Sequence, residues 1–505
     1  MSSQRVELSR LEDELPDPET ATNVTYNPSF ERLREFASHE ETTTEFGSPR
    51  YVSDQRSRSA DRTKNRIDDE FDESDWEAVG DALEVAAERE LICLDRVVGR
   101  HPETSYVCRL FVPREYARIA LAWGKLLEPA NEGADPDFRT LQLPEWGEDR
   151  DRRIRLFPDE GLTFVLGSDY TGEAKKSFLR LFMRRVKEDG GLGLHAGTKR
   201  VRIERDGEVT DVGQAFLGLS GTGKSTLTGH GCWLEESEGA EMLQDDVCAL
   251  LPDGRVPGSE GNGLYIKTIG LNRAEQPELY DAATHESAVL ENVAVEDGNV
   301  DFDDGTLTRN GRAVVLREHL DSAAEDIDLD EVDQVFFITR NPLMPPVARL
   351  TPRQAAVAFM LGESIQTSAG DPDAAGEAIR VVGTNPFIIG PEGEEGNRFS
   401  QLLADNDVDA YLMNTGSVGP DAADIGVEDS VNILVAAARG EIEWTRDETL
   451  GLEIPADVLG VDVESLHPAR HYENYADELA DLRTERREFL AQFETLSEDI
   501  ADAVY

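Results

Sequence analysis

A glycine-rich stretch, GLSGTGKST, occupies residues 218–226 and follows three apolar residues at 215–217. It fits the pattern GxxxxGK[ST], in which backbone N–H groups curl around phosphate oxygens. Lys224 would reach the outer phosphates of a nucleotide, and the hydroxyl of Ser225 could bind Mg²⁺. The stretch predicts a phosphate-binding loop. ATPases, GTPases and kinases of many kinds carry such a loop, so it does not name the acceptor.

Three other side chains could bind a metal ion near that loop. Asp246 follows an apolar stretch about 20 residues after Ser225, where the next strand of a phosphate-loop core often supplies a metal-binding acid. Lys176 belongs to the stretch YTGEAKK, and a nearby cation could lower the pKa of its amine enough for it to act as a ligand. His195 offers an imidazole. The alternatives are a solvated acid, an exposed cation at a helix start and a core histidine.

Two arginines could bridge a donor phosphate and an acceptor anion, because a guanidinium binds both groups with paired hydrogen bonds. They are Arg312 in TRNGRAVVL and Arg58 in QRSRSADRT. Single arginines are more often surface residues, so neither identifies a site alone.

The charge balance excludes whole classes of protein. The 505 residues hold 103 Asp and Glu against 50 Lys and Arg, a net charge of −53 that runs through the whole chain. A nucleic-acid binder or a protein that binds anionic membranes would carry the opposite sign. We interpret the diffuse acidity as adaptation to concentrated salt, where the Debye length falls to about 3 Å at 1 M. An acidic interaction protein is the alternative.

Lysine usage agrees with this interpretation. Only eight residues are Lys, and Lys175, Lys176, Lys224 and Lys267 all lie in the short motifs. The four cysteines form no CxxC pair, which favours small core residues in a reducing cytosol. The first residues lack an apolar signal core, and no run of 18 apolar residues is present. We therefore expect a cytoplasmic monomer with no membrane span.

Apolar periodicity predicts a mixture of strands and helices, the α/β or mixed α+β class. The predicted strands are 91–99, 105–112, 162–170, the segment before residue 218, 241–251, 333–341 and 409–416, and the predicted helices are 76–90, 114–127, 175–191, 427–440 and 475–496. We predict a flexible acidic leader at 1–45, an N-terminal domain at 46–190 and a C-terminal nucleotide-binding domain at 191–505. The stretch DGGLG near residue 190 separates the two motif-bearing parts.

Taken in order, the motifs resemble the ATP-dependent phosphoenolpyruvate carboxykinase family. The resemblance covers roughly residues 50–440. Its most specific parts are YIKTIGL within GSEGNGLYIKTIGLNRAEQPELYDA and NVDFDDGT within LENVAVEDGNVDFDDGTLTRNGR. It also includes YTGEAKK, the later His195, LGLSGTGKST, QDD and AYLMNTG. The family fold implies an N-terminal substrate domain and a C-terminal P-loop mononucleotide-binding domain, with the active site in a cleft.

The resemblance implies a role for each matching residue. Arg58 and Tyr170 match positions that bind the carboxylate of oxaloacetate or phosphoenolpyruvate, and Lys175 accompanies Lys176 in the catalytic cluster. Lys176, His195 and Asp246 match the ligands of Mn²⁺. The triphosphate loop is matched by Ser220, Gly221, Thr222, Gly223, Lys224, Ser225 and Thr226, with Ser225 at Mg²⁺. Lys267 and Arg312 match further phosphate contacts.

The implied reaction joins oxaloacetate and ATP to give phosphoenolpyruvate, CO₂ and ADP in gluconeogenesis, with ATP, Mg²⁺ and Mn²⁺ as cofactors. Departures from the family lie in the first loop, SRSADRT, and in the adenosine pocket. Gln276 replaces an acid there, and Asp424 stands at the position of an arginine. These changes leave the nucleotide identity open. The alternatives are another P-loop phosphotransferase acting on a small molecule or a protein, and a non-catalytic nucleotide-binding relative.

Overall fold

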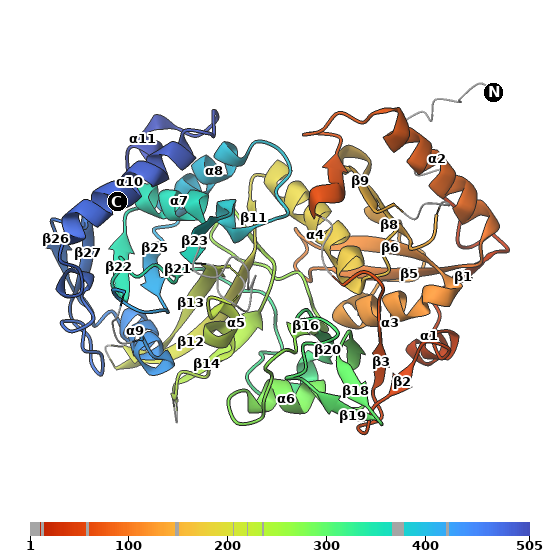
Figure 1. Cartoon of the computed structure of the whole chain (residues 1–505), viewed down its shortest axis with the longest axis horizontal. Helices are drawn as coiled ribbons and strands as arrows, with labels where there is room; N and C mark the ends of the chain where they lie inside the picture. The colour runs from red at the N-terminus through yellow and green to blue at the C-terminus, as the bar shows by residue number, and fades with distance from the viewer. Residues whose placement is uncertain are drawn as a thin grey trace. The chain divides into compact units, whose positions relative to one another are not determined.

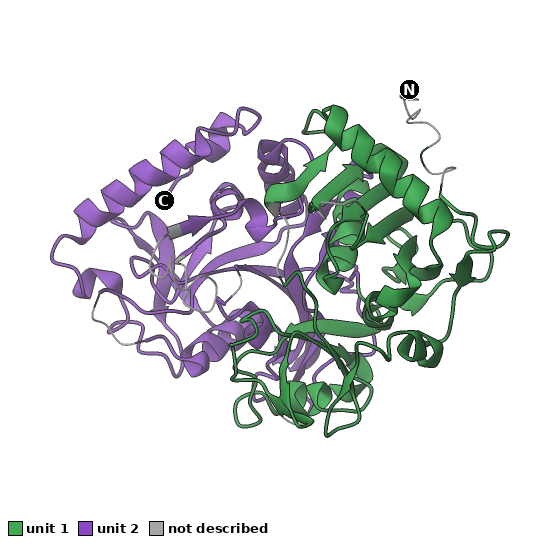
Figure 2. Ribbon diagram, turned by 45° about the vertical axis from the view of Figure 1, so that its right-hand side comes forward, with its two compact units in different colours: residues 1–185, 260–321 green, residues 186–259, 322–505 purple. Residues whose placement is uncertain are grey.

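A computed structural model describes residues 11, 15–56, 60–146, 151–205, 207–219, 221–234, 237–365, 378–420 and 424–505. The chain divides into two compact units, coloured separately in Figure 2. Unit 1 comprises residues 1–185 and 260–321, and unit 2 comprises residues 186–259 and 322–505. The segment at 260–321 thus packs with the first part of the chain. The predicted ranges 46–190 and 191–505 stay predictions.

Unit 1 contains two sheets (Figure 1). The larger sheet has the order β1 (Val24–Tyr26), β5 (Leu91–Val98), β6 (Tyr106–Pro113), β8 (Phe138–Leu143), β10 (Leu162–Leu166), β9 (Arg153–Phe157) and β4 (Thr63–Asn65), with β7 (Glu128–Pro129) beside β5. The smaller has the order β16 (Gly263–Lys267), β20 (Arg312–Leu316), β17 (Val289–Glu291), β3 (Pro49–Tyr51) and β2 (Thr42–Thr43). A separate ribbon pairs β18 (Ala294–Glu296) with β19 (Asn299–Asp301).

The helices of unit 1 are α1 (Phe30–Phe36), α2 (Glu73–Glu88), α3 (Ala117–Leu126), α6 (Pro277–Ala283) and α4 (Thr171–Glu188), whose last residues belong to unit 2. Helix α2 begins at the capping box of Asp72 and Asp75 and buries its apolar side on the larger sheet. Helix α3 contacts strands of both sheets, so it joins the two layers.

Part of the segment predicted as a flexible leader, 1–45, is built into unit 1. Strand β1 pairs in parallel with β5, and Leu33 of α1 is fully buried. The short strands and scattered polar residues of this segment gave a weak periodic signal, but backbone pairing to β5 fixes it in place. Residues 1–10 and 12–14 lie outside the described residues.

Unit 2 is built on one mixed sheet. Its order is β14 (Gly239–Gln244), β12 (Ala196–Arg205), β13 (Glu208–Gly218), β21 (Gln334–Thr339), β25 (Asp409–Asn414), β22 (Val347–Leu350), β27 (Leu452–Asp457) and β26 (Glu443–Asp447). Strands β13, β21 and β25 are parallel. Two small pairs join β11 (Leu192–Leu194) to β15 (Cys248–Leu250) and β23 (Glu363–Ile365) to β24 (Ala378–Arg380). The predicted α/β class is confirmed.

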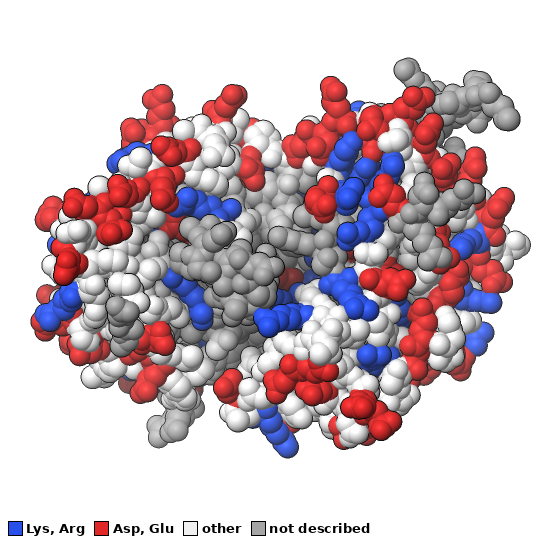
Figure 3. Space-filling model, viewed as in Figure 1, with Lys and Arg blue, Asp and Glu red and all other residues white. Residues whose placement is uncertain are grey.

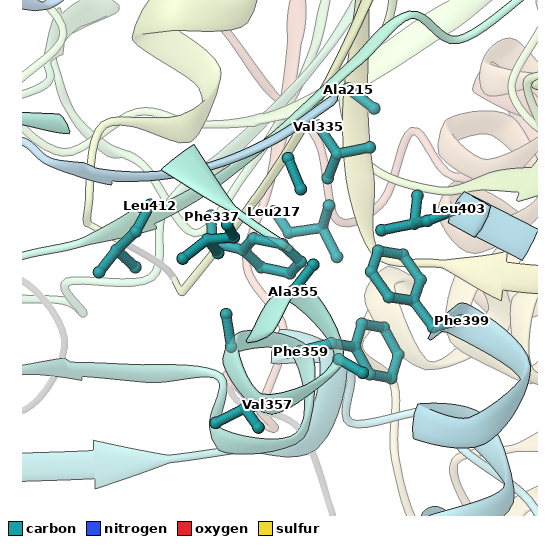
Figure 4. Packing of buried hydrophobic residues seen from close by; sticks show 14 of the residues in the cluster. Ala215, Leu217, Val335, Phe337, Ala355, Val357, Phe359, Phe399, Leu403 and Leu412 are labelled. Carbon is teal, nitrogen blue, oxygen red and sulfur yellow. The ribbon is translucent and has the colours of Figure 1, made fainter. Parts of the chain in front are cut away.

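Side chains of the central strands alternate between two apolar cores. On one face, Phe337 of β21 packs with Phe359 and Phe399 (Figure 4). On the other, the rings of Phe216, Phe336 and Tyr411 stack across β13, β21 and β25 at centroid distances of 5.5 and 5.0 Å. Helices α7 (Pro352–Leu361), α8 (Glu392–Asp405), α10 (Tyr475–Leu490) and α11 (Glu498–Ala501) cover the first face, and α5 (Lys224–Gly229) and α9 (Val427–Arg439) cover the second.

The segment 241–251, expected as one buried strand, forms two. Strand β14 ends at Gln244 and β15 begins at Cys248, and Asp245 and Asp246 lie in the bend between them. Two consecutive carboxylates are costly to bury inside a strand, so the chain turns where they occur. The break places both acids at the end of β14.

Acidic side chains are spread over the visible face of both units (Figure 3). This distribution matches the even spacing of Asp and Glu along the sequence. Within the described part of the chain, no helix combines the length and the apolar run that a bilayer crossing requires.

The stacked rings of unit 2 generate a stability prediction. Phe336 is fully buried between Phe216 and Tyr411. We expect Phe336→Ala to lower the free energy of unfolding by about 3–5 kcal/mol, because it removes a buried ring and leaves a cavity. Chemical denaturation measures the loss. As a control, Leu459→Ala should change stability by less than about 0.5 kcal/mol, since Leu459 is 86% exposed. Equal effects of the two variants would contradict the packing described.

Candidate active site

The phosphate-binding loop follows β13 as the sequence indicates, and the described part of it requires glycine. Gly221 and Gly223 have φ angles of 85° and 98°, a region that residues with a Cβ rarely enter. Helix α5 begins at Lys224 directly after Gly223. Ser220 lies outside the described residues. The strand, loop and helix predicted here are all present.

Thr222 anchors this loop to the sheet. Its backbone N–H and hydroxyl both donate to the carbonyl of Leu219, at 3.2 and 2.7 Å. The hydroxyl of Thr415, at the end of β25, donates to the carbonyl of Thr222 at 2.6 Å. The loop is therefore fixed from its own strand and from a second strand of the same sheet.

A buried lysine holds the far end of α5. The ammonium of Lys199 donates to the carbonyl of His230 at 2.6 Å and to the carbonyl of Leu227. The side chain is fully buried, and this burial lowers the pKa of the ammonium. A cation at the carboxyl end of a helix satisfies carbonyls that lack a partner within the helix. Lys199 thus fixes the position of the helix that carries Lys224 and Ser225.

His195 and Asp246, two of the three predicted metal ligands, lie together in unit 2. The Nε2 atom of His195 is 3.1 Å from Oδ1 of Asp246. Its Nδ1 is 2.6 Å from the carbonyl oxygen of Thr384. A carbonyl only accepts, so Nδ1 carries a proton and donates it. In the neutral imidazole, the lone pair of Nε2 then faces the carboxylate, so both groups would be available to hold one cation.

Asp246 also lies on the same side of unit 2 as the phosphate loop. Strands β13 and β14 both pair antiparallel to β12, with Ala196 opposite Leu217 and Thr198 opposite Gln244, so their carboxyl ends lie at the same edge of the sheet. The phosphate loop follows β13, and Asp246 follows β14. The donor set found in unit 2, one imidazole and one carboxylate beside a phosphate loop, suits a divalent cation.

Among the described residues, no group of three or more His, Cys, Asp and Glu side chains is arranged to hold a metal ion. The predicted set contains only two such groups, and its third donor is the amine of Lys176. Lys176 belongs to unit 1. The joint role of these three residues stays a prediction, as does the role of Ser225.

Thr384, which orients His195, has an unusual backbone. Its φ is 52°, a region that a β-branched residue seldom adopts. Gly362 makes this possible, because a Cβ there would lie 1.7 Å from the carbonyl oxygen of Val381 and 3.0 Å from the nitrogen of Thr384. The two segments therefore pack backbone against backbone behind His195.

A buried carboxylate secures the same region. Glu363 accepts from Arg486, Arg380 and Asn341 at 2.7, 2.9 and 2.9 Å. Burial acts to raise the pKa of Glu363, but the charge and hydrogen bond of Arg486 outweigh it and hold that pKa at about 2. The carboxylate is charged under all ordinary conditions, so the three donors stay bound.

In unit 1, one amide links two predicted site residues. The side-chain nitrogen of Asn310 donates to the hydroxyl of Tyr170 at 3.1 Å, and its oxygen accepts from Arg312 at 3.0 Å. The same nitrogen donates to the backbone carbonyl of Arg56 at 2.7 Å. Arg312 lies 5.3 Å from the ring centroid of Tyr265. Tyr170 and Arg312 are thus linked through one amide, and their roles at the substrate carboxylate and at phosphate stay predictions.

The paired lysines of α4 differ in their surroundings. Lys175 is buried and forms an ion pair with Glu260 at 2.9 Å. Lys176 lies 5.3 Å from the ring centroid of Tyr170, and its nitrogen is 3.8 Å from a carboxylate oxygen of Glu173. Lys176 therefore shares the face that carries Tyr170. Lys175 faces a buried acid, and its catalytic role stays a prediction.

The start of α4 is fixed by a buried ion pair. Arg118 donates to the carboxylate of Asp169 at 2.6 Å and to its backbone carbonyl at 2.8 Å. The same carboxylate accepts from the backbone N–H groups of Asp54 and Gln55 at 2.8 and 2.9 Å. This arrangement joins the start of α4 to the backbone at residues 54 and 55. Arg58 itself lies outside the described residues.

The residues that raised the question of nucleotide identity are both described. Gln276 precedes α6 in unit 1, where it stands at the N-cap without a side-chain capping bond. Asp424 pairs with Ser417 in an isolated bridge of unit 2. Neither lies in the phosphate loop.

Several residues that shape the site escaped sequence reasoning. Asn310 lies in the stretch TRNGR, two residues before Arg312, and this spacing alone could have suggested that the two side chains interact. Thr384, Arg118 and Lys199 carry no such signal. Each acts through a fold contact made across 28 or more residues, such as Lys199 with Leu227 and Thr384 with His195.

Comparison with known proteins decides the family. A family model described as phosphoenolpyruvate carboxykinase matches residues 23–464. The chain belongs to the phosphoenolpyruvate carboxykinase family. The predicted family, its two-domain α/β class and its ATP-dependent activity are thereby confirmed. The match begins at residue 23, whereas the resemblance in the sequence begins near residue 50. It therefore includes β1, the strand paired with β5.

Individual members of this carboxykinase family cover most of the chain. A phosphoenolpyruvate carboxykinase (ATP) from Aeropyrum pernix is 35% identical over 487 residues, which is 95% of this chain and 96% of the relative. Proteins of the same name from Azorhizobium caulinodans and Brucella suis are each 29% identical, over 79% of this chain and 75% of the relative.

Lys267 generates a pH prediction for this carboxykinase. Burial, and then the charge of Arg312 opposite it in the β16–β20 pair, lower the pKa of Lys267 to about 8. If Lys267 binds phosphate, nucleotide affinity should fall as the pH rises through about 8, because the ammonium is lost. Calorimetric titration with ATP between pH 6.5 and 9.5, both about 1.5 units from that pKa, measures this change. Lys267→Met should bind more weakly at low pH and show no such step.

The same titration has a consequence of opposite sign for stability. The folded pKa lies below the ordinary value of 10.5, so the unfolded chain holds more protons between the two values. The free energy of unfolding should therefore rise between about pH 8 and 10.5 relative to Lys267→Met. A wild-type profile that parallels the variant would show that Lys267 does not titrate in this range.

Proposed function

We propose that the chain catalyses the ATP-dependent conversion of oxaloacetate to phosphoenolpyruvate, CO₂ and ADP, within gluconeogenesis. One observation supports this most directly. The glycine-rich loop, anchored at Thr222, follows β13 at the same edge of the sheet where His195 and Asp246 lie 3.1 Å apart. A phosphate loop beside a metal-binding pair is what phosphoryl transfer requires. Family membership supplies the substrate.

The reaction breaks the C–C bond to the departing CO₂ and the bond between the γ-phosphorus and ADP. It forms the P–O bond of phosphoenolpyruvate. When CO₂ leaves oxaloacetate, the electron pair of the broken C–C bond stays with the remaining carbons as an enolate. The enolate oxygen attacks the γ-phosphorus of ATP in line, and the bond from that phosphorus to the β–γ bridging oxygen breaks to release ADP. Lys224 and Arg312 would neutralise the charge on the transferring group.

The tyrosine–asparagine–arginine contact explains how the acceptor would be held. Tyr170 and Arg312 share Asn310, so the group that binds the substrate carboxylate and the group that contacts phosphate are fixed to each other. Arg58 would complete the carboxylate contacts. Positioning of this kind removes orientational freedom from the reactants, which is a major source of rate in phosphoryl transfer.

We assign Mn²⁺ to Lys176, His195 and Asp246, and Mg²⁺ to Ser225 beside the nucleotide phosphates. The donor set fits a divalent ion, because His195 presents Nε2 toward the carboxylate of Asp246 while Thr384 holds its other nitrogen. A bound cation lowers the free energy of the developing enolate oxygen and of the phosphoryl oxygens. Thr384 keeps the imidazole in the orientation that this requires.

Three finer assignments belong to the same proposal. The acidic surface in Figure 3 supports activity in concentrated salt. Burial of all four cysteines, none of them in a disulfide, supports a reducing cytoplasm. The negative net charge supports a monomer that binds neither nucleic acid nor anionic membranes.

The direct test is formation of phosphoenolpyruvate from oxaloacetate in molar KCl, with ATP, Mg²⁺ and Mn²⁺. Product is expected only when nucleotide and divalent metal are both present. GTP and pyrophosphate should be tried as donors in parallel, because Gln276 and Asp424 differ from the family pattern. No product with any of the three donors would contradict the proposed reaction.

Lys176 provides a residue-level prediction. Lys176→Arg keeps the positive charge but cannot act as a neutral amine ligand. We expect its kcat to fall by about 100-fold or more, with a weaker dependence on Mn²⁺, on the scale seen when one stabilising group is removed from an active site. Lys187→Arg, on the same helix and paired with Glu395 at 2.6 Å, is the matched control and should retain activity. Unchanged Mn²⁺ affinity in Lys176→Arg would exclude the assigned ligand.

A further inference from the structure

Arg340 occupies a position level with the phosphate loop on the neighbouring strand. Strand β21 runs parallel to β13, and Ile338 is the register partner of Gly218. Arg340 comes two residues after Ile338, as Ser220 comes two residues after Gly218. In open sheets with parallel strands, ligands bind at the carboxyl ends of those strands. Arg340 therefore stands at the ligand-binding edge of the sheet, one strand from the loop.

Backbone contacts connect Arg340 to the loop. Thr415 donates its hydroxyl to the carbonyl of Thr222 at 2.6 Å, and its backbone N–H to the carbonyl of Thr339 at 3.0 Å. The side chain of Arg340 begins against the next residue, Gly416, where an added Cβ would lie 3.1 Å from the Cβ of Arg340. Thr415 thus contacts the phosphate loop, and the adjoining Gly416 lies against the stem of Arg340.

The guanidinium of Arg340 has no anionic partner in the described part of the chain. Its Nε is buried and makes no hydrogen bond to the described residues, and no described carboxylate forms an ion pair with it. Other arginines of the same unit are paired, such as Arg349 with Asp409 at 2.6 Å, and Arg380 and Arg486 with Glu363. The chain has 103 Asp and Glu residues, so a shortage of carboxylates does not explain why none of the described ones pairs with Arg340.

The surroundings favour an anion as the missing partner. A half-buried guanidinium is stable when it is paired, and phosphate is the group that its planar donors bind best. The sequence between Asn414 and Arg439 contains no Lys or Arg, and Asp424 of this stretch bridges to Ser417, next to Gly416. Arg340 thus provides a positive charge beside a stretch, residues 415–438, that has no Lys or Arg of its own.

We propose that Arg340 binds the polyphosphate of the nucleotide, alongside Lys224. This inference rests on the proposed function, because it takes the nucleotide in the loop to be the phosphoryl donor. Arg340 would add a second fixed positive charge from β21, and its bidentate geometry would orient the phosphates toward the end of β13. Its contribution is made to phosphate groups and not to the base.

Calorimetric titration of full-length protein tests this with three probes: Mg·ATP, pyrophosphate and adenosine. A charge-assisted hydrogen bond contributes about 1.5–3 kcal/mol, so Arg340→Gln should weaken binding of Mg·ATP and pyrophosphate by about 10- to 100-fold. Adenosine affinity should not change. Arg340→Lys should recover part of the loss, because it restores the charge without the paired donors. Arg349→Gln, which loses an exposed ion pair on β22, is the matched control and should bind as wild type.

The outcomes separate the two proposals. Binding of Mg·ATP by Arg340→Gln at wild-type strength, while Lys224→Ala loses it, would overturn the role of Arg340 and leave the proposed function standing. Equal weakening of adenosine and pyrophosphate would overturn the assignment to phosphate. Absence of nucleotide binding in the wild-type protein would overturn the proposed function, and the role of Arg340 with it. Thermal unfolding of each variant checks that it is folded. If Arg340→Gln does not fold, Arg340→Lys takes its place in the comparison.

Discussion

The predicted site residues of unit 1 are positioned by the ion pair between Arg118 and Asp169. Both charges are almost fully buried, and their pairing, together with Glu40 at 2.8 Å from Arg118, offsets the cost of removing them from water. Asp169 directly precedes Tyr170 and then α4, which carries Lys176, and its carboxylate also holds the backbone at residues 54 and 55. One buried pair therefore fixes the start of the helix and the backbone at residues 54 and 55.

Unit 2 uses buried charge for a similar purpose. Glu363 is bound by two arginines and an asparagine, and it adjoins Gly362, against which the Thr384 segment packs. Thr384 keeps a positive φ that would cost on the order of 1–3 kcal/mol if the surroundings did not enforce it. Its carbonyl then fixes the imidazole of His195. The strained backbone of Thr384 thus serves to orient the imidazole of His195, although Thr384 itself takes no part in the proposed chemistry.

Much of the fold and the phosphate loop could be predicted because local rules decide them. The positive φ angles of Gly221 and Gly223 match the demand of the motif for glycine, and α9 ends before Gly440, whose φ is 67°. The rest depends on contacts between distant segments. Helix α4 starts at Thr171 and not at Lys175, because Glu291 accepts from the N–H of Thr171 at 3.0 Å. The roles of Thr384 and Arg340 likewise depend on contacts with residues far away in the sequence, His195 and Gly416.

The cysteines have a practical consequence. All four thiols are buried, and burial raises the pKa of Cys93, Cys108 and Cys248, so the reactive thiolate is scarce in the folded chain. Two thiols lie in each unit, Cys93 and Cys108 in the first and Cys232 and Cys248 in the second. Alkylation of either pair therefore requires that unit to open, and peptide mapping of the label would time the opening of each unit separately without any engineered probe.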